Sequence, residues 1–417
     1  MNIAASTKLN NFLHKKLNVN DVEEWSRSPK ITKQFYNKDI KIRLGLTCVG
    51  FIQKKNQSVS HALFKKSKYK KNDKLIKISA KIFIVAAGGI ASNQLILNSI
   101  KKKDGLKLLS KNLIGKFYMC HLSESIADIK LLANMGNFFF GFTRLNGGYS
   151  RRLIKFPMNY LKKKNLLNIS FYIKNLDISN YRHKNGLLSI IYLILSLPFV
   201  NKLFAPKSII KKVKGRNEKK YSQHLVNIFK DPFSIIRTLF FLFYSKVFKR
   251  DDYVSRFLFQ PSKDYNGLQF ISEQEPKASC KLILSKSRNY LGQQKIDVDF
   301  KWSKNDIKSI IKAHYLLDKI LRKNNLGKLI FHHPRNKLFK FLNNNCIDGI
   351  HQLGGLRMGT NFNNGVTNNF GQLFGAKNVF ISSTALFPTG GSSAPTFTLV
   401  ALVFRQVNYI IKYFKFF

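Results

Sequence analysis

A histidine at the start of a glycine-rich segment is the residue of this sequence best suited to chemistry. His351 opens the run His-Gln-Leu-Gly-Gly-Leu-Arg-Met-Gly, which ends at Gly359. A histidine titrates near neutral pH, so it can take up a proton under physiological conditions and act as a general base. Taken alone, a histidine at the edge of such a loop is better explained as a surface or capping residue.

Three further elements follow this histidine in order. Residues 378–381 (Asn-Val-Phe-Ile) are largely apolar, residues 387–389 read Phe-Pro-Thr, and residues 394–398 (Ala-Pro-Thr-Phe-Thr) open a long apolar helix. Together with His351, these spaced elements resemble the C-terminal signature of the glucose-methanol-choline (GMC) family of FAD-dependent oxidoreductases. The resemblance implies removal of a hydride from a CH–OH carbon of a sugar or alcohol, with His351 as the base that takes the hydroxyl proton.

A second informative segment lies at residues 81–89 (Lys-Ile-Phe-Ile-Val-Ala-Ala-Gly-Gly), ahead of a helix predicted from Ile90 to about Ile100. A continuous apolar strand is typical of a parallel sheet buried on both faces. Small residues at its end let the phosphate or ribose of a ligand approach the backbone. A plain buried strand with a tight turn explains this segment equally well when it is taken alone. Residues 86–90 and 112–121 also resemble segments of the GMC flavin domain.

The remaining patterns predict the elements that position these segments. Alternation from Ile40 to Leu46 predicts a half-buried strand, and the lysine-rich residues 54–74 predict a solvated hairpin arm or loop. Alternating runs at 167–172, 269–274 and 296–302 indicate an antiparallel sheet with one polar face. Apolar residues from Ile307 to Leu321 mark one face of an amphipathic helix, on which we interpret His314 as a packed core residue.

The GMC resemblance implies an α/β protein of two domains. One is an incomplete, doubly wound FAD-binding domain assembled from separated segments, and the other is a substrate domain built on an antiparallel sheet. We predict that residues 1–120 are the remaining part of the flavin domain, that 121–349 form the substrate domain, and that 350–417 return to the flavin domain and the active site.

The resemblance also implies roles for individual residues. Ala394 occupies a position where many GMC members have Asn or His, which acts with the base on the substrate hydroxyl. An alanine side chain can neither donate nor accept a hydrogen bond, although the neighbouring Ser393 carries a hydroxyl. The positions implied to contact FAD are Ala87, Gly88, Gly89, Ser383, Thr384 and Thr396, the last at a helix N-terminus.

One family element is absent from the sequence. GMC proteins begin with a Gly-x-Gly-x-x-Gly loop that holds the FAD pyrophosphate on a helix N-terminus, and no such loop occurs here. We therefore expect a truncated enzyme, or one that needs a separate N-terminal polypeptide carrying the FAD loop. A gene remnant is a third reading.

The charge of the chain has two competing explanations. The 417 residues carry 72 Lys and Arg against 21 Asp and Glu, a formal net charge of +51, and only 15 of the cations are Arg. One explanation is a polyanion or an anionic membrane surface as partner of a non-catalytic scaffold. Codon bias toward Lys, Asn, Ile and Phe is the explanation that we favour. Specific DNA readers favour the planar Arg fork, so we expect no sequence-specific nucleic-acid binding.

Cysteine spacing and hydropathy indicate the cellular compartment of the protein. The four cysteines lie far apart without metal-ligand spacing, so we expect free thiols, no metal site and a cytoplasmic protein. The N-terminus lacks a signal-peptide pattern. The apolar stretches Leu187–Val200 and Ile235–Phe248 are shorter than the roughly 20 residues of a membrane span. We interpret them as buried or lid helices, with peripheral membrane contact as the alternative.

Overall fold

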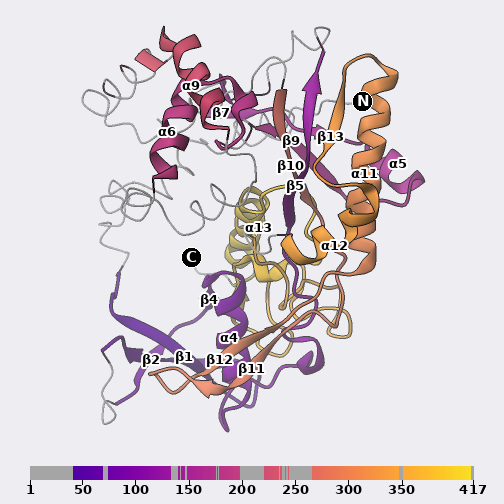
Figure 1. The fold of residues 1–417 in the computed structure, drawn as a ribbon. Helices are drawn as coiled ribbons and strands as arrows, with labels where there is room; N and C mark the ends of the chain where they lie inside the picture. Colours follow the sequence, from indigo (N-terminus) through magenta and orange to yellow (C-terminus); the bar gives the residue numbers. More distant parts are fainter. Residues whose placement is uncertain are drawn as a thin grey trace.

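The computed structural model describes residues 41–68, 74–132, 140–197 (less 141, 146–147, 175 and 177), 220–236 (less 234), 240, 243, 265–346 and 351–414. These residues form a mixed α/β fold with a large antiparallel sheet (Figure 1). The domain boundaries predicted at residues 120 and 349 remain a prediction.

The first described unit is an antiparallel meander of three strands in the order β1-β2-β3: β1 (Leu46–Gln53), β2 (Val59–Lys66) and β3 (Ile76–Ser79). The strand predicted from Ile40 to Leu46 is wrong, because β1 only begins at Leu46. Ile42 and Leu44 are 56% and 88% exposed, so their alternation has no packing partner among the described residues. The hairpin arm predicted at 54–74 is present, because β2 pairs with β1, but it is not wholly solvated. Its first half contains β2, where Val59 and Ala62 are buried.

The predicted apolar strand and the helix after it are confirmed as β4 (Phe83–Val85) and α4 (Gly88–Ile100). β4 pairs in parallel with β14 (Val379–Ile381), so two segments almost 300 residues apart lie side by side. The backbone N–H of Ser382 continues this pairing by donating to the carbonyl of Val85 at 2.8 Å. A core of residues from the meander, α4 and β14 packs around this pair.

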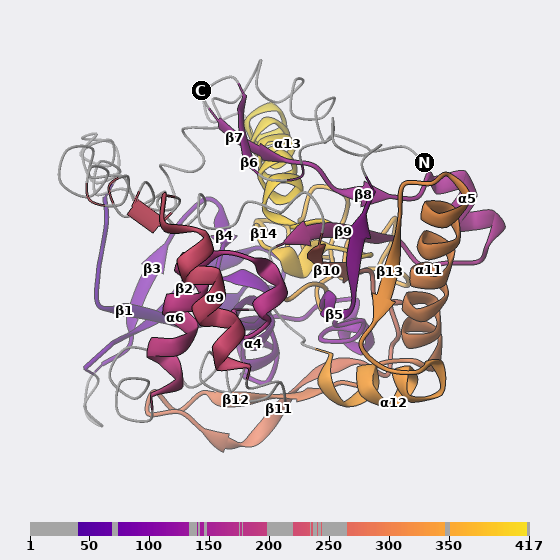
Figure 2. The same cartoon turned by 45° about the horizontal axis from the view of Figure 1, so that its top comes forward.

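The second core belongs to a five-stranded antiparallel sheet that curls around α11 (Lys304–Lys323) and α12 (Arg335–Asn345) (Figures 1 and 2). Its strand order is β13 (Gly327–Phe331), β5 (Leu122–Leu131), β10 (Tyr265–Ser272), β9 (Ile169–Lys174) and β8 (Ile154–Lys155). Two of the three predicted strands, at 167–172 and 269–274, are therefore confirmed in this sheet as β9 and β10. The third is β12 (Gln294–Asp299), which pairs with β11 (Lys281–Arg288) in a separate hairpin.

Helix α11 confirms the predicted amphipathic helix and its core histidine. A capping box formed by Ser303 and Asp306 fixes its first turn. The ring of His314 is fully buried and meets the rings of Phe171 and Phe270 edge-on, with centroids 4.9 and 5.2 Å away. The helix therefore packs against one face of the antiparallel sheet.

The other described elements are α5 (Met158–Lys163), the β6–β7 hairpin (Phe142–Leu145 and Gly148–Arg151), α6 (Gly186–Ser196), α9 (Tyr221–Lys230) and α13 (Thr396–Phe414). α6 lies in the first predicted apolar stretch and packs against α9, where Ser189 and His224 are hydrogen bonded at 3.0 Å. The second stretch, Ile235–Phe248, lies mostly outside the described residues. No described helix has both the length and the apolar character needed to cross a bilayer.

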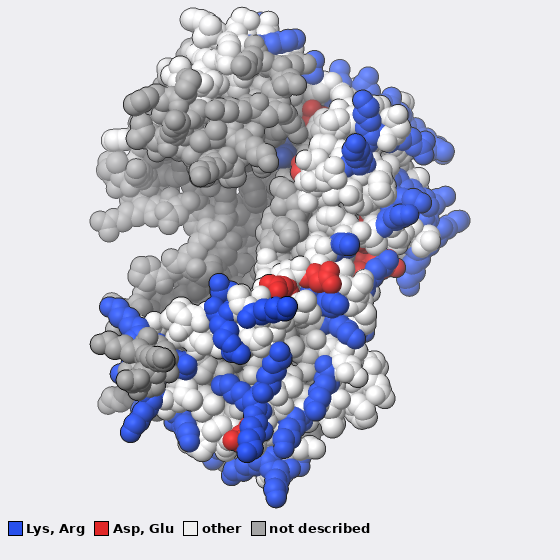
Figure 3. Space-filling model, turned by 60° about the horizontal axis from the view of Figure 1, so that its bottom comes forward, with Lys and Arg blue, Asp and Glu red and all other residues white. Residues whose placement is uncertain are grey.

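The cationic side chains do not form a single stripe. Figure 3 shows Lys and Arg distributed over much of the visible face, with a few Asp and Glu among them. The described residues on this face are thus broadly basic.

Candidate active site

Two histidines meet because two distant segments pair in register. Met119 and Leu353 form an antiparallel bridge in which each backbone N–H donates to the other's carbonyl at 2.9 Å. Residues two positions from such a pair, in opposite directions along the two segments, also lie opposite each other and share a face. By this rule His121 faces His351. Their ring nitrogens Nδ1 and Nδ1 are 2.9 Å apart.

The hydrogen bonds of this pair determine where the protons lie. His121 Nε2 is 3.0 Å from the carbonyl oxygen of Gly390. A carbonyl oxygen can only accept, so His121 Nε2 carries the hydrogen. In a neutral imidazole the other nitrogen is then an acceptor. His351 must therefore donate from Nδ1–H to His121 Nδ1, and this leaves the Nε2 lone pair of His351 available to accept a proton.

Burial keeps both rings neutral. His121 is 2% exposed, and burial lowers its pKa below the ordinary histidine value, while the Gly390 and Gly391 backbone and the nearby Glu273 oppose this shift. Burial also lowers the pKa of His351, and the adjacent His121 lowers it further. Both effects disfavour the imidazolium. At neutral pH the pair thus holds the tautomers derived above.

The loop that accepts from His121 is fastened to the antiparallel sheet. Glu273 Oε1 accepts from the backbone N–H of Gly391 at 3.3 Å. Ser170 Oγ donates to the carbonyl of Ser392, and Ser392 Oγ donates to Asn168 Oδ1 at 2.9 Å. These bonds connect the Gly390 carbonyl to strands of the sheet, which fixes the acceptor that orients His121.

Ala394 is exposed just beyond this loop, and no described contact joins it to His351. Its neighbour Ser393 accepts a hydrogen bond from Lys155 Nζ at 2.9 Å. Burial lowers the pKa of Lys155. A partly buried ammonium group therefore lies next to the position where the family pattern would place Asn or His.

The small residues after β4 lie close to the histidine segment. Gly89 approaches Gln352 so closely that a Cβ at this glycine would be 2.6 Å from the Gln352 carbonyl oxygen. Asn93, one turn further along α4, donates from Nδ2 to the carbonyl of Gly354 at 3.1 Å. Gly89 and Gln352, the residue that follows His351, therefore lie side by side. Ala87 and Gly88 are exposed at the same strand end.

The other three residues predicted to contact FAD differ in their exposure and in their contacts. Thr384 donates from Oγ1 to the Gln352 carbonyl at 2.6 Å, so it supports the His351 segment. Ser383 is 1% exposed, and its hydroxyl accepts from the backbone N–H of Ala385. Thr396 is exposed at the first residue of α13, which Figure 1 shows between the antiparallel sheet and the α4–β4 unit.

These residues fit a flavin dinucleotide at this edge. Gly88 has a φ of +77°, and a Cβ added there would meet no atom within 4 Å, so open space borders the backbone. The N-terminus of α4 has no side-chain cap and no acidic residue in its first turn. The first turn of a helix leaves its N–H groups without intrahelical partners, and these favour anionic groups. Among the described residues no group of His, Cys, Asp or Glu has the arrangement of a metal site.

Sequence reasoning missed two residues of this site. His121 ends a segment that we had compared only with the flavin domain, and Lys155 lies in a short strand without any motif. The signal for His121 was its place after residues 112–120, which resemble the family. Lys155 gave no signal in the sequence.

Part of the sequence matches the model of a known family. The sequence model of the family described as GMC oxidoreductase matches residues 276–402. No curated protein matches the sequence.

Solved structures similar to this chain include pyridoxine 4-oxidase from Mesorbium loti, with 11% identity and a TM-score of 0.49, over 91% of this chain and 60% of that one. A formate oxidase variant (R554A) from Aspergillus oryzae RIB40 has 13% identity and a TM-score of 0.47, over 91% and 62%. An FAD-dependent oxidoreductase from Chaetomium thermophilum has 10% identity and a TM-score of 0.48, over 94% and 64%. The chain thus spans less than two thirds of the length of these proteins. Residues 276–402, which include His351, Ala394 and Thr396, thus match the sequence model of the GMC oxidoreductase family.

Proposed function

We propose that this chain acts as an FAD-dependent oxidoreductase on the CH–OH group of a sugar or an alcohol, with His351 as the general base. The observation that carries the proposal is the bond between His351 Nδ1 and His121 Nδ1 at 2.9 Å. Together with the bond from His121 to the Gly390 carbonyl, it leaves Nε2 of His351 unprotonated. A base in this state is ready to accept the hydroxyl proton.

The chain of hydrogen bonds also suits the protonated state. When His351 gains a proton at Nε2, its Nδ1–H continues to donate to His121, so no bond has to break. His121 stays neutral because its Nε2–H is committed to Gly390 and its ring is buried. The new charge therefore stays on the ring that faces the substrate, where it would stabilise the oxygen that has lost its proton.

Bound FAD would supply the acceptor for the hydride that leaves the substrate carbon. Ala87, Gly88 and Gly89 would line it at the end of β4, and the N-terminus at Thr396 would direct backbone N–H groups toward it. The parallel β4–β14 pair, with α4 alongside, supports the assignment of these elements to a doubly wound flavin domain. Ser383 is a weaker candidate for contact, because its side chain is buried.

We further propose that a pyrophosphate anchor outside these 417 residues completes the FAD site. No Gly-x-Gly-x-x-Gly loop occurs in these 417 residues, and the backbone N–H groups of such a loop contribute strongly to dinucleotide binding. All four cysteines are free thiols, which agrees with a reducing, cytoplasmic location.

The test compares the parent protein with His351→Ala, each supplied with FAD and with a polypeptide carrying the missing loop. Anaerobic reduction of the flavin by candidate sugars and alcohols is followed by its absorbance. Loss of a general base should slow reduction about 10²–10⁴-fold, while the flavin content stays unchanged. Equal rates in the two proteins would show that His351 has no catalytic role.

A further inference from the structure

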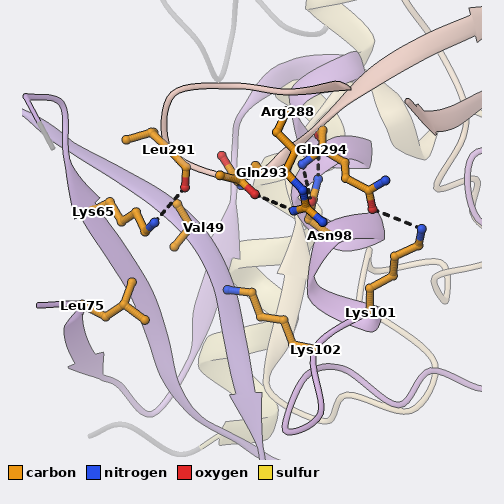
Figure 4. A pocket seen from close by; sticks show the side chains of 11 residues that line it. Val49, Lys65, Leu75, Asn98, Lys101, Lys102, Arg288, Leu291, Gln293 and Gln294 are labelled. Carbon is orange, nitrogen blue, oxygen red and sulfur yellow. Dashed lines mark hydrogen bonds between the residues drawn. The ribbon is translucent and has the colours of Figure 1, made fainter. Parts of the chain in front are cut away.

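A second cavity, of about 590 Å³, lies away from the histidine pair (Figure 4). It is bounded by β1 and β2 of the meander, the C-terminal end of α4 and the β11–β12 hairpin. Among the described lining residues are four cationic side chains, Lys65, Lys101, Lys102 and Arg288, and no Asp or Glu. At 1.5 Å per residue, α4 separates this cavity from Gln352 by roughly 20 Å.

Three of the cations are held in place by neutral acceptors. Lys65 Nζ donates to the carbonyl of Leu291 at 2.8 Å, and Arg288 Nη1 donates to the carbonyl of Gly292 at 2.7 Å. Lys101 Nζ donates to Gln294 Oε1 at 3.1 Å, as Figure 4 also shows. These bonds orient the side chains without neutralising their charge.

Lys102 differs, because its ammonium group has no hydrogen-bond acceptor among the described residues. Its side chain lies over Gly50, where a Cβ would be 2.7 Å from Nζ, and in Figure 4 it extends toward Lys65. Burial lowers the pKa of Lys102, and repulsion from Lys65 contributes, while the Cys48 thiol opposes the shift. An ammonium group in this position gains from any anion that enters the cavity.

Among the described lining elements, the C-terminal end of α4 supplies a compensating partial charge. A helix C-terminus carries about half a negative elementary charge, which is far less than four cations require. The cavity also has an apolar side, formed by the buried Val49 and Leu291 together with the partly exposed Leu75. The amide of Gln293 lies beside them, whereas the amide of Asn98 is already hydrogen bonded to the backbone of Gln94 and Gln294.

We propose that this cavity binds a small molecule that carries a diphosphate group. Lys65, Lys101 and Lys102 would act as point charges on the phosphates, and Arg288 would present its planar guanidinium to two phosphate oxygens. The apolar side suits a ring or carbon chain attached to the diphosphate. This proposal is independent of the proposed oxidoreductase function and concerns a different part of the molecule.

The general basicity of the chain is the main competing explanation, so the test needs a matched lysine. Binding of inorganic pyrophosphate and of ADP to the full chain is measured by isothermal titration calorimetry at 0.15 M salt. Lys102→Met removes the charge but keeps the carbon chain, and Lys308→Met makes the same change at an exposed position on α11. Hydrogen bonds to charged groups contribute about 1.5–3 kcal/mol. Lys102→Met should therefore weaken binding about tenfold or more, and Lys308→Met should leave it nearly unchanged.

Three further measurements complete the test. Lys102→Arg should retain most of the affinity, because it preserves the charge, and near-UV circular dichroism checks that each variant is folded. Orthophosphate should bind more weakly than pyrophosphate. Equal losses in Lys102→Met and Lys308→Met, equal affinity for the two phosphates, or no binding by the parent protein would each overturn the proposal. If Lys102→Met fails to fold, Arg288→Gln replaces it under the same criteria.

Discussion

His351 and His314 are buried to different degrees, and burial lowers the pKa of both. Each also has one nitrogen that is hydrogen bonded. His314 Nδ1 lies 2.8 Å from the carbonyl of Ile310, and its Nε2 is buried without a partner among the described residues. His351 uses Nδ1 to contact His121, and its ring is partly exposed.

The difference lies in access to the second nitrogen. Protonation of His314 would place a charge between Phe171 and Phe270 in the core, where nothing polar can stabilise it. Protonation of His351 would place the charge at the edge of the site. A lowered pKa alone therefore does not distinguish the two histidines, whereas an accessible lone pair and a fixed tautomer are features that a general base needs.

The largest predicted difference between the two histidines is in how the free energy of unfolding depends on pH. Burial lowers the pKa of His314 to about 4, below its unfolded value near 6.5. The unfolded state therefore binds a proton first as the pH falls. Stability is intact above pH ~6.5 and is lost as the pH decreases toward 4. By linkage, His314 alone should make unfolding about 2 kcal/mol easier at pH 5 than at pH 7.5.

Urea unfolding at the two pH values measures this change. The parent protein contains other titrating groups, including His183, whose pKa burial also lowers to about 4. The informative quantity is therefore the difference from His314→Leu, which lacks the buried imidazole. A pH dependence that is the same in the parent and in His314→Leu would contradict the assignment of His314 as a neutral core residue.

A smaller effect is expected at His121. Leucine at this position removes the acceptor for His351 Nδ1–H, whereas asparagine keeps an amide oxygen near the position of Nδ1. His121→Leu should release the fixed tautomer of His351 and slow flavin reduction about tenfold, the size expected for one hydrogen bond to a group that becomes charged. His121→Asn should retain most of the rate.

The tautomer is read directly by ¹⁵N NMR of histidine-labelled protein without FAD, so this readout does not depend on activity. A hydrogen on Nδ1 of His351 in the parent protein and its loss in His121→Leu is the expected pattern. His351 with the same tautomer in both proteins would show that His121 only packs against it.

The smallest effect is expected at Ala394, an exposed residue near the candidate site. Ala394→Asn restores a hydrogen-bonding side chain at an exposed position beside Ser393 and should raise the rate of flavin reduction about threefold, less than one full hydrogen bond. Ala394→Leu is the matched control because it adds volume without polarity. If both variants react at the same rate, a side chain at this position does not reach the substrate hydroxyl.

The sequence predicted elements whose signals are local. The strand and helix at 81–100 follow from a continuous apolar run ending in glycines, and α11 follows from its apolar face. The strand placed at Ile40 to Leu46 failed because alternation indicates a strand only where a sheet or core is available to pack against. In the fold that surface begins with Val49 and Phe51, further along the same chain.

The sequence predicted separate motifs of the candidate site, but it did not predict which side chains contact one another. His351 was found because its neighbours carry a family pattern. The contact with His121 depends on the pairing of Met119 with Leu353, and no periodicity within either segment encodes that register. Lys155 comes to Ser393 from a two-residue strand at the edge of the antiparallel sheet. Such long-range contacts arise from tertiary packing alone.

The bridge between Met119 and Leu353 also bears on how the molecule folds. His121 and His351 are 230 residues apart in the chain, so their contact closes a loop that encloses most of the antiparallel sheet. Closing a long loop is entropically unfavourable until other contacts have shortened it, and non-local contacts of this kind slow folding. We therefore expect the histidine pair to form late in folding, after the sheet and α11 have packed. Newly made chains would then acquire the base in its working tautomer only at the last step of assembly.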